Sequence, residues 1–126
     1  MQCPKCKGDM VEKSYGGRIR IHRCEQCLGL YGHPETFARM KQEWMADAVL
    51  DKGDPSLGRQ YNKIEEVDCP QCGARMETLT DDKQTHISYE KCPECENVFF
   101  DAGEFTDWKH ETLMDVFRGI LAKIRD

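Results

Sequence analysis

No apolar run in the sequence approaches the roughly 20 residues that a membrane-spanning helix needs. Of the 126 residues, 33% are Asp, Glu, Lys or Arg and only 39% are hydrophobic. This composition argues against a membrane protein and leaves little material for a large apolar core. Chains this short and polar often rely on a metal ion or on disulfide bonds. We therefore expect a small fold that hydrophobic burial alone does not hold together.

Familiar catalytic motifs are also missing. The sequence has no Gly-rich phosphate loop, no His-Glu-x-x-His and no nucleophilic serine elbow. Its cysteines all fall into pairs that suit metal binding, which leaves no spare thiol nucleophile. We predict that the protein is not an enzyme and has no catalytic residue.

Acidic residues outnumber basic ones, 23 to 18, and the charge is unevenly distributed. The formal net charge is −5, and residues 69–126 carry seven Lys or Arg against twelve Asp or Glu. Residues 1–50, with eight against six, have the only positive balance. Because nucleic-acid binding relies on neutralising phosphates, we favour a protein partner over a nucleic acid.

The first cysteine, Cys3, stands too close to Met1 for a signal peptide to precede it in this sequence. We therefore expect a cytoplasmic protein in a reducing compartment. Clustered cysteines in such a compartment bind metal more often than they form disulfides.

The cysteines form two sets with nearly the same spacing. Each set is a Cys-x-x-Cys pair, an interval of 17 or 19 residues, and a second Cys-x-x-Cys pair. Four thiolates suit the tetrahedral geometry of structural zinc and leave no position open for water. We predict two Zn²⁺ ions, one per set, with iron as the alternative because rubredoxin-like centres use similar pairs. The predicted ligands are Cys3, Cys6, Cys24, Cys27, Cys69, Cys72, Cys92 and Cys95.

The chain is an internal repeat. An offset of 66 superposes the first cysteine pairs, and after a two-residue insertion an offset of 68 superposes the second pairs and the residues that follow them. Tyr31 then aligns with Phe99 and Phe37 with Phe105. We predict a first ribbon with a helix at 1–50, a linker at 51–68, and a second ribbon with a C-terminal helix at 69–126.

Each repeat has the pattern of a β-hairpin followed by an amphipathic helix. The first hairpin turns at Gly16-Gly17, and the second turns between Asp81 and Gln84. Apolar residues then recur at helical spacing from Phe37 and from Phe105. The expected fold is a small metal-stabilised α+β structure of two zinc ribbons, each a hairpin with a four-cysteine site and a following helix.

Both repeats resemble the zinc ribbon of the transcription-factor-IIB-like family. The second matches well through "CPQC", "CPEC" and "FFDAGEF". The first matches through "CPKC" and "CEQC" but has His33 where Asp is usual, and Glu35-Thr36 in place of Gly-Glu. The resemblance implies two zinc-ribbon folds, the eight zinc ligands given above, and a connection to transcription.

The first hairpin carries a group of basic residues that could contact nucleic acid or an acidic partner, namely Lys13, Arg18, Arg20 and Arg23. The alternative is an ordinary solvated face. The second hairpin has Asp81, Asp82 and Glu90 instead, which argues against a nucleic-acid reader built from both repeats.

Asp101 and Glu104 follow the last cysteine pair at the expected start of a helix. They have the spacing of a helix N-cap and its third position, so we interpret them as a capping box rather than as ligands or a base. His33, at the position equivalent to Asp101, is expected to start a helix or lie on the surface.

The C-terminal helical pattern extends beyond what a small ribbon can cover. We expect this extension to pack on the other repeat, on a protein partner, or on a second copy in a homodimer. The predicted partner face consists of Phe117, Ile120, Leu121 and Ile124.

Overall fold

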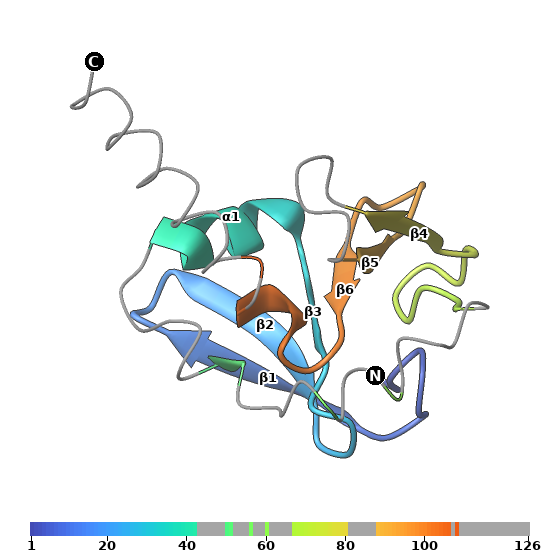
Figure 1. Cartoon of the computed structure of the whole chain (residues 1–126), viewed down its shortest axis with the longest axis horizontal. Helices are drawn as coiled ribbons and strands as arrows, with labels where there is room; N and C mark the ends of the chain where they lie inside the picture. The colour runs from blue at the N-terminus through green and yellow to red at the C-terminus, as the bar shows by residue number, and fades with distance from the viewer. Residues whose placement is uncertain are drawn as a thin grey trace, which may run out of the picture.

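The computed structural model of the chain describes residues 1–42, 50–51, 56, 60, 67–80, 88–106 and 108 (Figure 1). Six strands and one helix make up the regular structure of these described residues. In chain order they are β1 (Met10–Tyr15), β2 (Ile19–Cys24), β3 (Leu30–Gly32), α1 (Pro34–Gln42), β4 (Glu77–Thr80), β5 (Ser88–Lys91) and β6 (Val98–Phe100). No helix in the described part of the chain is both long and apolar enough to span a membrane.

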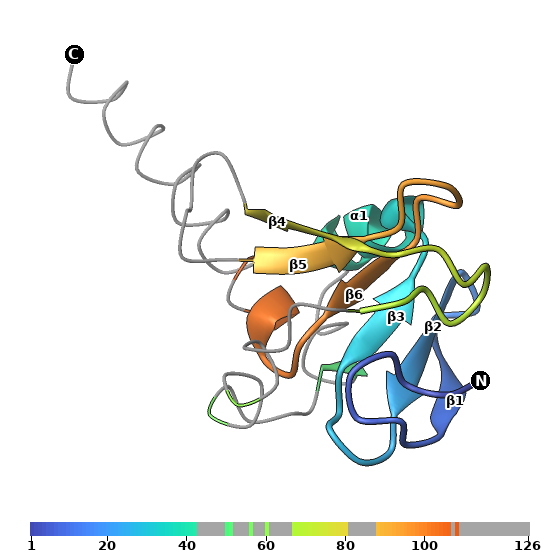
Figure 2. The ribbon, with the colours of Figure 1, turned by 90° about the vertical axis from the view of Figure 1, so that its right-hand side faces the viewer.

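All six strands belong to one antiparallel sheet in the order β1-β2-β3-β6-β5-β4 (Figure 2). The predicted small α+β fold with two cysteine-bearing hairpins is therefore confirmed. Each hairpin also has a third strand, β3 or β6, that was not predicted. Both are only three residues long, which is too short to produce a periodic pattern.

The pairing of β3 with β6 joins the two repeats into one sheet. Its register pairs Tyr31 with Phe99, which are also the residues that the repeat makes equivalent. Leu30 pairs with Phe100 and Gly32 with Val98. Because the repeat makes Leu30 equivalent to Val98 and Gly32 equivalent to Phe100, exchanging the two strands leaves the pairing unchanged. The two ribbons are thus related by an approximate two-fold axis at the Tyr31–Phe99 pair.

The first hairpin forms as predicted. Gly16 and Gly17 have φ values of 63° and 74°, a left-handed conformation that glycine adopts without steric cost. Ile19 and Ile21 are buried, while Arg20 between them is exposed, as expected for a strand with one covered face.

Helix α1 begins at Pro34, a residue suited to a first helical position. The Nδ1 atom of His33 accepts a hydrogen bond from the backbone N–H of Glu35 at 3.2 Å. His33 therefore caps the helix, in agreement with its expected place at a helix start. Phe37 and Met40 are buried toward the sheet, which confirms the predicted apolar face of this segment.

The residues of β3 and β6 alternate between two separate clusters. On one face, Leu30 and Phe100 pack with Phe37 of α1 and with Phe105. The rings of Phe37 and Phe100 lie edge to face, with centroids 4.9 Å apart. On the other face, Tyr31 and Phe99 pack among the cysteines of both repeats, and this second face therefore shapes the candidate metal sites.

The helical turn at 104–106 is capped differently from our prediction. The carboxylate of Asp51 accepts hydrogen bonds from the backbone N–H groups of Gly103 and Thr106, both at 3.0 Å. The side chain of Asp101 instead bonds Lys5, so the predicted capping box of Asp101 and Glu104 is wrong. The actual cap, Asp51, lies more than 50 residues earlier in the chain than the N–H groups that it accepts from, a separation over which local motifs carry no information.

Candidate metal centres

Four knuckles of the same geometry carry the eight cysteines. In each one, the first cysteine's carbonyl accepts a hydrogen bond from the N–H four residues later, and its N–H donates to the carbonyl five residues later. All eight bonds measure 2.7–3.1 Å. This closed turn directs both sulfurs of a Cys-x-x-Cys pair to the same side.

The residue after the second cysteine has a positive φ in every knuckle. These residues are Lys7 (66°), Leu28 (61°), Gly73 (78°) and Glu96 (68°). Three of the four are not glycine, and each such residue costs about 1 kcal/mol or more in the left-handed region. Strain of this kind persists only where the surrounding structure imposes it, here the closed turn that aligns the two sulfurs.

The first quartet consists of Cys3, Cys6, Cys24 and Cys27, whose ligand atoms all lie within 4.8 Å of one another. The Sγ atoms of Cys3 and Cys27 are 3.6 Å apart, and those of Cys6 and Cys24 are 3.3 Å apart. Backbone N–H groups point at the sulfurs, including Gly8 N to Cys6 Sγ at 3.4 Å. Such donors stabilise thiolate charge.

The second quartet, Cys69, Cys72, Cys92 and Cys95, has the same form. Its Sγ–Sγ distances are 3.6 Å for Cys69–Cys95 and 3.2 Å for Cys72–Cys92. It differs in exposure, because Cys72 is exposed, whereas in the first site Cys6 is the least buried ligand and is only partly accessible.

Both quartets fit a zinc ion. Four Zn–S bonds of about 2.3 Å in a tetrahedron place the sulfurs about 3.8 Å apart, slightly more than the distances found here. None of the eight cysteines forms a disulfide. Four protein ligands complete the coordination, so the chemistry that these sites support is structural. Because cysteines supply all four ligands of each site, no histidine is required as a ligand.

A tyrosine from the first ribbon reaches the second metal site. The hydroxyl of Tyr31 lies 3.0 Å from the Sγ of Cys69 and accepts a hydrogen bond from Asn97 Nδ2 at 3.1 Å. Burial, together with the hydrogen bond to Cys69, raises the pKa of the Tyr31 phenol far above its ordinary value. The phenol therefore keeps its proton at neutral pH.

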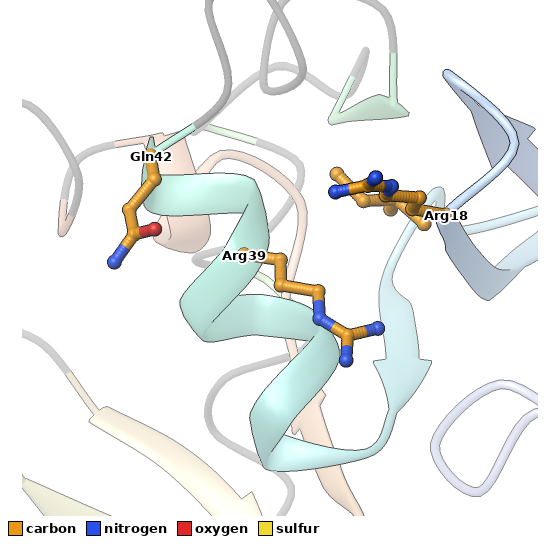
Figure 3. Close-up of a pocket in the computed structure, with 4 residues that line it drawn as sticks. Arg18, Arg39 and Gln42 are labelled. Atoms are coloured by element: carbon orange, nitrogen blue, oxygen red, sulfur yellow. The ribbon is translucent and has the colours of Figure 1, made fainter.

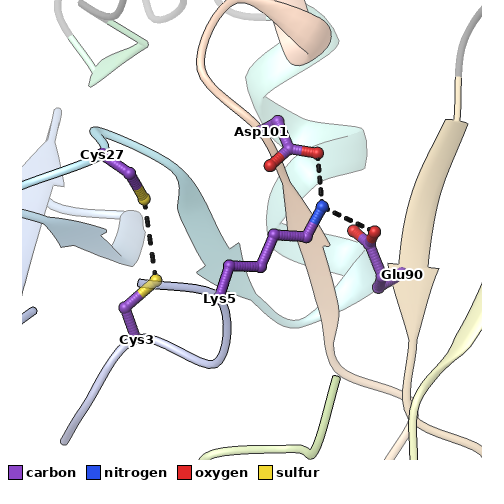
Figure 4. A network of polar contacts seen from close by, with 5 residues as sticks. All are labelled: Cys3, Lys5, Cys27, Glu90 and Asp101. Carbon is purple, nitrogen blue, oxygen red and sulfur yellow. Dashed lines mark hydrogen bonds and ion pairs between the residues drawn. The ribbon is translucent and has the colours of Figure 1, made fainter. Parts of the chain in front are cut away.

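Lys5, from the first knuckle, lies between two carboxylates of the second ribbon (Figure 4). Its Nζ is 2.7 Å from Glu90 Oε1 and 2.6 Å from Asp101 Oδ2. The exposed fraction of each of these three side chains is 1% or less. Lys5 Nζ also lies 5.5 Å from the centre of the Phe99 ring. This ion cluster links the first metal site to the sheet of the second ribbon.

The cluster contains one cation and two acids away from water. Burial raises the pKa of Glu90 to about 7, although the charge of Lys5 acts in the opposite direction. Burial likewise raises the pKa of Asp101, again against the effect of Lys5. A single ammonium does not fully compensate two buried carboxylates. The cluster therefore depends strongly on Lys5.

The basic residues of the first hairpin do not all share one face. Lys13 pairs with Ile21 in the β1–β2 register, so it lies on the face of Ile21 and Arg23, whereas Arg20 lies on the other face. Lys13 pairs with Glu25 at 3.7 Å, and Arg23 Nη1 donates to the carbonyl of Leu50 at 3.1 Å. Arg20 is exposed.

Arg18 instead lies beside helix α1. It lines a hollow of about 520 Å³ together with Ile19, Arg39 and Gln42 (Figure 3). The guanidinium groups of Arg18 and Arg39 make no hydrogen bond or ion pair within the described part of the chain. Sequence reasoning missed Arg39 and Gln42, since nothing in the sequence indicates that α1 approaches the hairpin tip.

Three predicted features lie wholly or largely outside the described part of the chain. They are the linker at 51–68, the turn of the second hairpin between Asp81 and Gln84, and the C-terminal helix after Phe105 with its predicted partner face of Phe117, Ile120, Leu121 and Ile124.

Comparison with known proteins identifies the second repeat. Residues 68–111 match the zinc-ribbon family described as transcription factor zinc-finger. This match confirms the resemblance stated for the second ribbon, and the first ribbon carries a four-cysteine site of the same form. No curated protein and no solved structure matches the chain significantly.

Proposed function

Since its residues 68–111 match the zinc-ribbon family described as transcription factor zinc-finger, we propose that this chain is a non-catalytic zinc protein that docks an acidic segment of another protein. Zinc in both four-cysteine sites holds the platform, and the hollow beside α1 supplies the contact. The proposal fits a cytoplasmic protein in which the thiols stay reduced.

The observation that carries this proposal is the pair of arginines in the hollow. Arg18 comes from the hairpin and Arg39 from α1, and both side chains extend into the space between these elements (Figure 3). Guanidinium groups recognise carboxylates through two parallel hydrogen bonds. Ile19 forms the base of the hollow but is buried, so the exposed contacts come from the arginines. The hollow therefore suits a short segment with acidic side chains.

Charge favours protein over nucleic acid as the partner. A duplex or single strand needs a track of several cations to neutralise successive phosphates. Here Lys13 is paired with Glu25, Arg23 bonds Leu50, and the net charge of the chain is −5. Two neighbouring arginines suffice for one or two carboxylates, but they provide little binding to a long polyanion.

The test is binding of a fluorescent glutamate-rich peptide to the zinc-loaded protein, measured by anisotropy. Arg18→Gln and Arg39→Gln are each expected to weaken binding at least about tenfold, since a lost charge-assisted hydrogen bond costs about 1.5–3 kcal/mol. Arg20→Gln is the matched control, because Arg20 is exposed but does not line the hollow.

If all three substitutions weaken peptide binding equally, the effect comes from the net charge of the protein and not from the hollow, which would contradict the proposed site. Stronger binding to a single-stranded oligonucleotide than to the peptide would favour the nucleic-acid alternative. To identify the natural partner, the zinc-loaded protein would be used as bait with and without nuclease treatment. A transcription protein captured in both cases would support the connection to transcription.

Zinc is proposed over iron for both sites. Metal analysis of protein purified without added metal should give about two zinc ions per chain and negligible iron. A red protein, the colour of an Fe(III)-thiolate centre, would instead favour the rubredoxin-like electron carrier.

A further inference from the structure

We infer that Tyr31 is a positioning residue for the second metal site, where its hydroxyl holds the ligand Cys69. Tyr31 belongs to β3 of the first ribbon and Cys69 to the second. Retention of the metal in one ribbon therefore depends on the docking of the other.

The direction of the hydrogen bond follows from the chemistry of its partners. A cysteine bound to a metal is a thiolate and has no proton to donate. Asn97 Nδ2 donates to the Tyr31 oxygen at 3.1 Å and to Gln71 Oε1 at 2.9 Å, which orients the phenol. The Tyr31 proton is then directed to Cys69 Sγ, 3.0 Å away. A donor to a buried thiolate stabilises its charge and fixes its position.

The internal repeat supplies a natural comparison. Phe99 is the equivalent of Tyr31, and Gly29 is the equivalent of Asn97. The Phe99 ring lies directly against Gly29, and it has no hydroxyl to offer the first site. The two sites therefore share their ligand geometry but differ in this donor. The second site is also the more open one, because Cys72 is exposed.

The difference predicts unequal effects of one substitution. In Tyr31→Phe, the ring remains and only the donor to Cys69 is lost. Removing a group that supports a metal ligand typically weakens metal binding about 10–100-fold. We expect this weakening at the second site alone, because Tyr31 is hydrogen-bonded to a cysteine of that site.

The experiment uses the full chain loaded with two equivalents of zinc and a chromogenic chelator. In Tyr31→Phe, one site should bind zinc at least tenfold more weakly and the other should bind it with unchanged affinity. In the protein loaded with ¹¹³Cd, the resonance that correlates with the Cys69 β-protons should shift and the other should stay. A general loss of packing would not produce this selective spectroscopic change.

Tyr89→Phe is the matched control, since Tyr89 packs with the other cluster, on the α1 face of the sheet. Asn97→Ala removes the donor that orients the phenol and should weaken the same site to a smaller degree. This second variant also keeps the test decisive if Tyr31→Phe fails to fold. The inference would be overturned if Tyr31→Phe weakened zinc binding equally at both sites, or if Tyr89→Phe had the same effect. It would also be overturned if a folded Tyr31→Phe or Asn97→Ala variant bound zinc with unchanged affinity at the second site.

Discussion

The ring of Phe99 lies so close to Gly29 that a Cβ atom on Gly29 would come within 2.3 Å of the ring's Cζ. Gly29 belongs to the first ribbon and Phe99 to the second, so this contact lies on the junction between the repeats. Phe99 is fully buried, so the ring cannot move out of the way without disturbing the core.

Gly29→Ala should therefore destabilise the protein by about 1–3 kcal/mol, the usual cost of overpacking. Denaturant unfolding measures the change. Adding Phe99→Leu should make the combined loss smaller than the sum of the single losses, because the smaller side chain admits the methyl group. Gly32→Ala is the milder comparison and should cost less, since its Cβ would meet Ile21 Cγ2 at 3.3 Å, a contact that a shift of a few tenths of an ångström relieves. Strict additivity would contradict the proposed clash.

Replacing Lys5 by Met should be more damaging. The substitution leaves Glu90 and Asp101 buried without their cation, a situation that costs about 3–5 kcal/mol. Thermal unfolding of the zinc-loaded protein is the measurement. Lys13→Met is the control and should cost about 1 kcal/mol or less, because the Lys13–Glu25 pair is largely solvated.

A second variant separates charge from packing at this cluster. Adding Glu90→Gln and Asp101→Asn to Lys5→Met should recover part of the lost stability, since no buried charge then remains. If the stability loss of this triple variant equals the sum of the losses of its three single substitutions, the damage comes from packing instead.

Asp51 should matter although it lies in the predicted linker. Asp51→Ala removes the acceptor of the Gly103 and Thr106 N–H groups and should cost about 1–2 kcal/mol. Thr106→Val, which loses only the hydroxyl bond to Asp51, should cost less. Urea unfolding distinguishes the two. If Asp51→Ala leaves the free energy of unfolding unchanged, the contact contributes nothing to stability.

Metal removal should unfold both ribbons together. Zinc binding in small ribbons contributes about 10–16 kcal/mol, which is comparable with the whole stability of a domain. Cys24→Ser or Cys92→Ser should therefore cost the metal of its own site and disturb the other through the β3–β6 pair. Circular dichroism and metal content of each variant measure these losses. Unchanged spectra and two bound ions would contradict the assignment of four cysteine ligands to each site.

Features that depend on short-range spacing could be predicted from the sequence. The Cys-x-x-Cys pairs bring their sulfurs together within one turn, and the Gly16-Gly17 pair specifies the hairpin. The apolar spacing of Phe37 and Met40 likewise indicated the buried face of α1. In each case the interacting atoms lie within a few residues of one another, or the pattern repeats often enough to recognise.

Features that depend on contacts between the repeats could not be predicted. Nothing near Lys5 in the sequence indicates that it pairs with two acids about 90 residues away. Asp101 has the local sequence pattern of a helix cap, but its side chain pairs with Lys5 instead. The same holds for Arg39, which joins Arg18 through the packing of α1. These side chains acquire their partners from the β3–β6 junction and the tertiary fold.

The symmetry of that junction has a consequence for how the two halves can change. The β3–β6 register is the one that two identical chains would use in an isologous dimer. Within a single chain, however, the facing surfaces are free to diverge. Lys5 meets Glu90 and Asp101, whereas the equivalent positions hold Gln71, His22 and His33. Two copies of the first half would place Lys5 opposite His22 and His33, and two copies of the second half would place Gln71 opposite Glu90 and Asp101. Neither half can therefore form this ion cluster by pairing with itself, and the covalent link keeps the two different halves together.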